Sequence, residues 1–365
     1  FRARVADAYR DGAGWLFSAD LGALVGDHAK KTQGSEGGSR GHEMAEKLGI
    51  LDVDNFLIDR REDGQHTETR AALTFRQARR GVAAWLAEPS PSGALEFFSP
   101  EANLAAMFAV KNPADIVDEL LASNAELAAH VEQFRREKGF DLREDLAAPL
   151  GGEVAFAIDG PMLPNPSWKL VVEVYDPTRL QQTITTTVEK INRELTAQGK
   201  PTLVLAETSS GGRTYYSLTG GETGFTAHYV FVDGYLVVAP SRTLLDRSIA
   251  TRASGLSIAK SDRLRNLLGR DGQVNVSALV YRNLDELSAI GRKVIPKGAL
   301  GGEGGKKPGV ASLLLGKGPS LLYAYAEEDR IVFASTGEAG PMGRNLELLA
   351  GLRGILGAGL GGDLD

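Results

Sequence analysis

The sequence predicts an α+β fold, in which antiparallel sheets built of hairpins carry helices packed on one face. One pattern behind this prediction is a strand that leads through an Asn or Asp cap into a helix, and the other is a hairpin that leads into a helix. The first pattern occurs at Val110-Lys111-Asn112-Pro113 and, about 64 positions later, at Val174-Tyr175-Asp176-Pro177. Recurrence of both patterns along the chain predicts diverged internal repeats.

The N-terminal part of the chain is predicted to contain a strand, a hairpin and a helix. The short apolar strand covers Trp15–Ser18. The hairpin strands cover Asp54–Arg60 and Thr67–Phe75, and the second alternates apolar and polar side chains as a half-buried strand does. A helix is expected over Gln77–Ala87, before the prolines that follow it.

Two long helices are expected in the centre of the chain. The predicted elements there are a strand over Leu104–Val110, a helix over 113–138, strands over Glu153–Ile158 and Trp168–Tyr175, and a helix over 177–198. Each helix begins at a proline that follows an Asn or Asp, because such a cap accepts a backbone hydrogen bond and proline suits the first helical position.

The most regular hairpin of the sequence pairs Phe225–Val232 with Tyr235–Ala239. Asp233-Gly234 joins the two strands and is typical of a two-residue type I′ turn. Strands over Thr202–Glu207 and Thr214–Leu218 are expected before this hairpin. A helix over Arg242–Ala250, capped by Ser241, is expected after it.

Glycine separates these elements, with 44 glycines among 365 residues against a usual fraction of ~7%. Two glycine-rich loops, 32–41 and 296–309, lie between strand and helix patterns. We therefore expect three parts: a first α+β unit over 1–98, an expanded central unit over 99–273, and a C-terminal unit over 274–365. The last unit is expected to contain a strand over Val274–Tyr281, a helix over Asp285–Val294, a hairpin of Leu321–Ala326 with Arg330–Ser335, and a helix over Arg344–Ile355.

Composition excludes several classes of protein. The chain has no cysteine, which excludes disulfide scaffolds, cysteine-based zinc or iron–sulfur sites and a cysteine nucleophile. Its net charge of -6 argues against nucleic-acid binding, which usually needs a basic face. No apolar run reaches the ~18 residues of a membrane-spanning helix.

Motif searches give no catalytic, cofactor or metal residues. His42-Glu43-Met44-Ala45-Glu46, in a helix expected over His42–Leu48, resembles a zinc helix but carries Glu46 where the second histidine belongs. A nucleophile elbow and a phosphate-binding loop are both absent from the sequence. The acidic run Glu327-Glu328-Asp329 lies at a predicted hairpin tip and is interpreted as a solvated turn.

Aromatic side chains on neighbouring strands form the candidate binding surface. Its members are Tyr215, Tyr216, His228, Tyr229 and Tyr235. Tyr215 and Tyr216 are consecutive in a strand and must point to opposite faces, so one of them could line a surface. The alternative is that these residues form cross-strand aromatic pairs that only stabilise the sheet.

Three stretches resemble large uncharacterised bacterial envelope proteins of acidobacterial type, which carry repeated α+β domains of unknown function. The stretches are Phe75–Leu86, Ala94–Ala102 and Val230–Ala239. The resemblance implies an anchored or exported protein that faces the periplasm, and it implies no catalytic residue. The absence of cysteine fits an oxidising compartment, and the start at Phe1 leads us to expect a signal or anchor upstream. A cysteine-poor cytoplasmic protein is the alternative.

Three functions are compatible with the sequence. The first is a non-enzymatic extracytoplasmic scaffold or protein-interaction module, such as an accessory subunit of an envelope complex, with another envelope protein as partner. The second is a periplasmic binding protein for a lipid, glycan or peptide, which would use a groove between the sheet and the helices 113–138 and 177–198. The third is a hydrolase whose carboxylate pair the sequence does not identify.

Overall fold

The computed structural model is described over residues 2–22, 46, 49–63, 66–161, 166–221, 224–268, 275–283 and 319–336. The chain divides into two compact units, of which unit 1 combines residues 1–91 with 263–365 and unit 2 comprises residues 92–262. The sequence predicts three parts, at 1–98, 99–273 and 274–365. The structure differs because strand pairing joins segments from both ends of the chain in unit 1.

Unit 1 contains six described strands in an antiparallel sheet. The strands are β1 (Trp15–Asp20), β2 (Val53–Asp63), β3 (His66–Phe75), β11 (Ala278–Arg282), β12 (Ser320–Ala326) and β13 (Arg330–Thr336). Their order in the sheet is β1-β2-β3-β13-β12-β11. The predicted hairpins β2–β3 and β12–β13 are confirmed, and the pairing of β13 with β3 places Phe333 opposite Ala71.

Short helical segments accompany this sheet. They are α1 (Arg2–Arg10), η1 (Ile50–Asp52), α4 (Val82–Trp85) and α9 (Asp262–Arg265), which begins at the last residue of unit 2. Ala8 and Ala13, from α1 and the turn after it, pack against Leu57 of β2. The helix α1 was not predicted from the sequence.

The helix predicted over Gln77–Ala87 is wrong in length, because only Val82–Trp85 is helical. Arg79 explains the irregular backbone around it. Its guanidinium donates hydrogen bonds to the carbonyl oxygens of Ala83 and Leu86, and to those of Ala326 and Glu327 at the end of β12. These hydrogen bonds hold the loop after β3 against the end of β12, and the carbonyl oxygens of Ala83 and Leu86 bond to Arg79.

Unit 2 contains seven strands, also in antiparallel pairs. The strands are β4 (Leu104–Ala109), β5 (Leu150–Ile158), β6 (Trp168–Val174), β7 (Leu203–Ser210), β8 (Arg213–Gly220), β9 (Phe225–Val232) and β10 (Tyr235–Ala239). Their order is β4-β5-β6-β10-β9-β8-β7. The turn between β9 and β10 is confirmed, with φ of 51° at Asp233 and 82° at Gly234.

Unit 2 contains seven helical segments among the described residues, and three of them start where the sequence predicts a helix. The seven segments are η2 (Ala94–Phe97), α5 (Pro113–Ser123), α6 (Ala125–Lys138), η3 (Leu142–Ala147), α7 (Pro177–Ala197), α8 (Arg242–Ser254) and η4 (Ile258–Lys260). The side chains of Asn112, Asp176 and Ser241 cap α5, α7 and α8 as predicted. The single helix predicted over 113–138 is wrong, because Asn124 leaves the helical conformation and its side chain accepts a hydrogen bond from the Leu127 amide to start α6.

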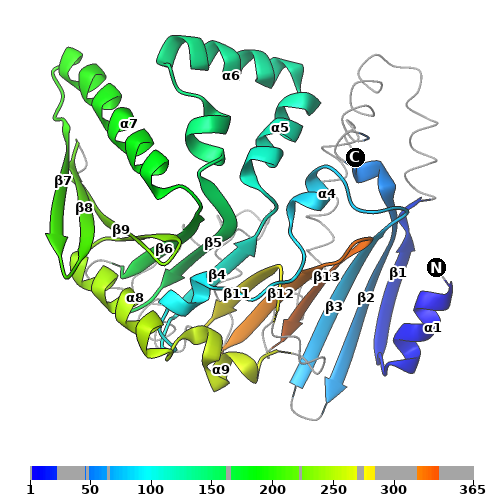
Figure 1. Cartoon of the computed structure of the whole chain (residues 1–365). Coiled ribbons are helices and arrows are strands. Elements are labelled where there is room, and N and C mark those ends of the chain that lie inside the picture. Colours follow the sequence, from blue (N-terminus) through cyan, green and yellow to red (C-terminus); the bar gives the residue numbers. More distant parts are fainter. Residues whose placement is uncertain are drawn as a thin grey trace, which may run out of the picture. The chain divides into compact units, whose positions relative to one another are not determined.

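The unit 2 sheet has helices on both faces, so the prediction of helices on one face does not hold for this unit. On the α8 face, Ala155, Val171, Val237, Val230 and Tyr215 form a buried row across five strands. Helix α8 packs there, and α7 packs on the opposite side, the α7 face (Figure 1).

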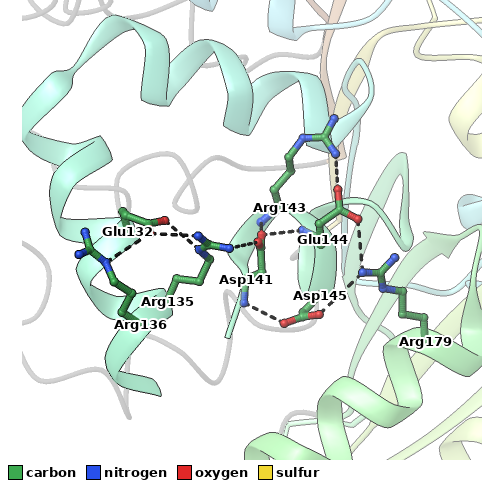
Figure 2. A network of polar contacts seen from close by, with 8 residues as sticks. All are labelled: Glu132, Arg135, Arg136, Asp141, Arg143, Glu144, Asp145 and Arg179. Carbon is green, nitrogen blue, oxygen red and sulfur yellow. Dashed lines mark hydrogen bonds and ion pairs between the residues drawn. The ribbon is translucent and has the colours of Figure 1, made fainter. Parts of the chain in front are cut away.

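A network of surface charges connects α6, η3 and α7 (Figure 2). Arg135 contacts both Glu132 of its own helix and Asp141, whose side chain accepts hydrogen bonds from the first amides of η3. Arg179 of α7 reaches Glu144 at 3.3 Å and Asp145 at 3.8 Å. Single exposed pairs contribute little to stability, but this connected set links η3 to α7 at two carboxylates.

Beneath α8 lies a buried ion pair. Lys169 of β6 places its Nζ 2.6 Å from Oδ2 of Asp159, and the two side chains are 2% and 5% exposed. Asp159 also accepts hydrogen bonds from the backbone amide and the hydroxyl of Ser99. Burial would raise the pKa of Asp159, but Lys169 and Ser99 outweigh burial and hold that pKa below its ordinary value.

Several predicted elements lie outside the described residues. They are the helices over Asp285–Val294 and Arg344–Ile355, the loops 32–41 and 296–309, and the helix over His42–Leu48 apart from Glu46. Within the described part of the chain, none of the helices is both long enough and apolar enough to cross a membrane.

We predict that Asp159→Asn lowers the free energy of unfolding of unit 2 by roughly 3 kcal/mol at neutral pH, because Lys169 then loses its buried counter-charge. The difference from wild type should shrink below about pH 4, where the wild-type carboxylate also takes up a proton. Urea denaturation followed by Trp168 fluorescence, with Trp15 and Trp85 replaced by Phe, measures this.

Asp115→Asn removes an exposed carboxylate on α5 and is the matched control. It should change the free energy of unfolding far less than Asp159→Asn does. A loss of stability at Asp159→Asn that is equal at neutral and acidic pH would contradict the ion-pair interpretation.

Candidate functional site

The five predicted aromatic-surface residues lie on two faces of the unit 2 sheet. The pairing of Tyr215 with Val230 and of Tyr235 with Val232 puts Tyr215, His228 and Tyr235 on the α8 face. Tyr216 is opposite Tyr229, and both belong to the α7 face. The five residues therefore do not form one surface, and a binding role for any of them stays a prediction.

On the α8 face, Tyr215 and Tyr235 each contact a charged side chain of unit 2. The guanidinium of Arg242 lies 3.0 Å from the ring centroid of Tyr215. Tyr235 donates its hydroxyl proton to Glu153 at 2.8 Å, and the same carboxylate accepts the amides of Gly93 and Ala94 at the start of η2. Burial and the Glu153 charge raise the pKa of Tyr235. These contacts hold η2 on the sheet.

On the α7 face, Tyr216 and Tyr229 stack with their ring centroids 4.9 Å apart and their planes 14° from parallel. The hydroxyl of Tyr229 donates to Oε1 of Gln181 on α7 at 3.0 Å. Burial raises the pKa of Tyr229 to about 12. The stack is a cross-strand aromatic pair, the structural alternative that the sequence left open.

The edge strand β7 is more accessible than the tyrosines on the two sheet faces. It is the last strand of the unit 2 sheet and pairs only with β8 among the described strands. Asn192 of α7 closes one end of this edge, because its side-chain amide accepts from the Leu203 amide at 2.7 Å and donates to the Leu203 carbonyl at 2.8 Å. The Leu203 backbone groups therefore point away from β8.

The turn at the other end of β7 shows independently which residues direct their backbone groups away from β8. Gly211 and Gly212 have φ of 59° and 74°, as a two-residue type I′ turn requires, and this turn closes on the hydrogen-bonded pair Ser210–Arg213. Residues alternate along an antiparallel strand, so Leu205, Glu207 and Ser209 direct their backbone groups outward, as Leu203 does.

Strand β7 lacks most of the features that keep a sheet edge from pairing with another strand, such as lysine or proline. The strand LVLAETSS has one charged residue, Glu207, and neither proline nor lysine. Val204 is 57% exposed, and the residues from Ala206 to Ser210 are all exposed. The sequence predicts a shorter strand, over Thr202–Glu207, because the serines and glycines that follow are typical of a turn.

Acidic and histidine side chains give no candidate metal site in the described part of the chain. No three His, Asp or Glu side chains there lie close enough together to hold a metal ion. The neighbouring carboxylates Glu144 and Asp145 both contact Arg179 (Figure 2). His130 is exposed on α6 and His228 is half-buried, while His28 and His42 lie outside the described residues.

We predict that Tyr229→Phe reduces the loss of stability that wild type shows between about pH 10 and pH 12, a loss to which Tyr235 also contributes. Wild-type unfolding releases the Tyr229 proton in this window, since the pKa is about 12 in the folded chain and about 10 in the unfolded chain, so stability falls as pH rises. The expected difference is roughly 2 kcal/mol. Urea denaturation at several alkaline pH values measures it, and parallel curves for both proteins would contradict it.

A comparison with curated proteins found no match. Three matching solved structures are crystal forms of TP0453. Form III is 12% identical, with 68% of this chain and 95% of that chain covered at a TM-score of 0.33. Form I is 13% identical, with 73% and 86% covered at 0.31, and form IV is 14% identical, with 74% and 99% covered at 0.32.

A family model described as "Protein of unknown function (DUF3352)" matches residues 91–301. The match covers more than half of the chain and includes all of unit 2. The predicted resemblance to a family of unknown function is thus confirmed, whereas the acidobacterial type and the internal repeats stay predictions. The chain belongs to this DUF3352 family.

Proposed function

We propose that the protein is a non-enzymatic extracytoplasmic interaction module, which binds an extended segment of another envelope protein along strand β7. The observation that carries this proposal is the set of outward backbone groups at Leu205, Glu207 and Ser209. Each such residue offers one donor and one acceptor, and an added strand would pair with them as the next member of the sheet.

The two ends of the edge define the length of the binding segment. Asn192 occupies the Leu203 backbone groups, and the Gly211-Gly212 turn ends the strand at Ser210. The open stretch therefore runs from Leu205 to Ser209. Because Asn192 already makes hydrogen bonds of the kind that a neighbouring strand makes, it supports the view that this edge accepts a strand.

Charge gives the partner segment one chemical requirement. Glu207 is exposed and lies opposite Tyr216, so an added strand would place a side chain beside the Glu207 carboxylate. A Lys or Arg at that position is favoured, since opposite charges on neighbouring strands stabilise pairing. The absence of cysteine and the envelope resemblance support a periplasmic location and an envelope protein as partner.

A periplasmic binding protein for a lipid or peptide is the second candidate function. Phe108 of β4 and Val154 and Phe156 of β5 share the α7 face and are 43%, 37% and 36% exposed. Exposed apolar side chains gathered on one sheet face favour an apolar ligand. We also infer that β4–α5 and β6–α7 are diverged copies of one unit, since both lead through a cap and a proline into a helix.

We predict that Glu207→Pro abolishes partner binding while unit 2 stays folded. Proline removes the outward amide of Glu207 and places its ring where the added strand would lie, yet it leaves the bonds between β7 and β8 intact. A photo-crosslinking residue at Ser209, introduced in the native host, should give one adduct with an envelope protein that is absent from the proline variant.

Glu207→Ala is the control, because it removes the carboxylate and keeps the amide. It should weaken the adduct, and Glu207→Pro should remove it. Persistence of the adduct in the proline variant would contradict strand addition. An adduct with a second copy of this chain, or with a lipid in place of a protein, would contradict the proposed partner.

A further inference from the structure

A cavity opens on the α8 face of unit 2, away from β7. Its volume is ≈520 Å³, within the range of small-molecule sites. Its walls come from the turn after η2, the ends of β5 and β6, and α8. The lining residues are Ser99, Glu101, Asp159, Gly160, Lys169, Arg247, Ala250, Thr251 and Ser254.

Lys169 reaches this cavity as a buried cation with few partners. Its ammonium group has three N–H donors, and in the described structure its acceptor is Asp159 at 2.6 Å. The carboxylate of Asp159 is shared with the amide and hydroxyl of Ser99. Because Lys169 is only 2% exposed, its remaining donors cannot rely on bulk water and need acceptors inside the cavity.

Arg247 adds a second cation from the α8 wall. It is exposed at the cavity and forms no ion pair within the described residues. Its charge lies close enough to disfavour the protonated form of Lys169. An acceptor with negative charge between the two groups would relieve this repulsion and satisfy donors of both.

We propose that this cavity binds the carboxylate group of a small organic acid between Lys169 and Arg247. A single negative charge fits better than a phosphate dianion, because Asp159 already balances Lys169 and Glu101 stands at the same wall. Thr251 and Ser254 line the α8 side of the cavity, where the Ser254 hydroxyl already bonds to the backbone of α8 and of Leu256. This site is independent of the β7 edge and adds a ligand to the proposed interaction module.

Calorimetric titration of the purified chain with acetate, butanoate and octanoate tests the proposal, with methyl butanoate as the uncharged probe and inorganic phosphate as the alternative anion. At least one carboxylate should bind with one-to-one stoichiometry, and the methyl ester should not. Arg247→Gln should weaken carboxylate binding by roughly tenfold or more. Arg193→Gln, the same change of charge at an exposed position of α7, should leave binding unchanged.

The chain-length series distinguishes two sources of the carboxylate. Tightest binding of acetate or butanoate assigns the cavity to short acids, and tightest binding of octanoate assigns it to fatty acids; both support the proposal. Equal binding of ester and acid, tighter binding of phosphate, equal loss in the two arginine variants, or no binding to folded protein would each overturn it.

Discussion

An open antiparallel sheet must end in a strand whose outer backbone groups have no neighbouring strand, and this constraint governs unit 2. In water such groups are solvated, but they also form a ready template for another strand. The structure closes one position of the β7 edge with the Asn192 side chain and ends the strand at the Gly211-Gly212 turn. Between these two points the edge remains accessible from Leu205 to Ser209.

The α8 face of the same sheet also contains hydrogen-bond donors that need partners. Lys169 is buried with Asp159 as its acceptor, while Arg247 stands at the same cavity. A buried ammonium group, like an open strand edge, carries donors that need partners. The two features lie on different parts of the sheet, so each can act without the other.

Local patterns in the sequence predict the turns and helix starts of unit 2, because these depend on neighbouring residues. Asn112, Asp176 and the Asp233-Gly234 turn are examples. The break at Asn124 was missed because the apolar spacing of 113–138 continues across it. The helix predicted over Gln77–Ala87 was too long because Arg79 binds a carbonyl 247 positions away, which no local pattern reveals.

Sheet order is the other part that the sequence does not predict. Alternation identifies β7 and β8 as strands, but it does not show that β7 is last in the sheet. For the same reason the sequence groups Tyr215, Tyr216, His228, Tyr229 and Tyr235 as one aromatic cluster, whereas pairing register divides them between two faces. The cavity at Lys169 likewise depends on α8 packing over the ends of β5 and β6.

Residue-resolved amide hydrogen exchange of the free protein tests the open edge most directly. We expect the amides of Leu205, Glu207 and Ser209 to exchange at least roughly tenfold faster than those of Val204, Ala206 and Thr208, which bond to β8. The Leu203 amide should be protected by Asn192. Equal protection of all these amides would mean that the edge is already covered and would contradict an open β7 edge.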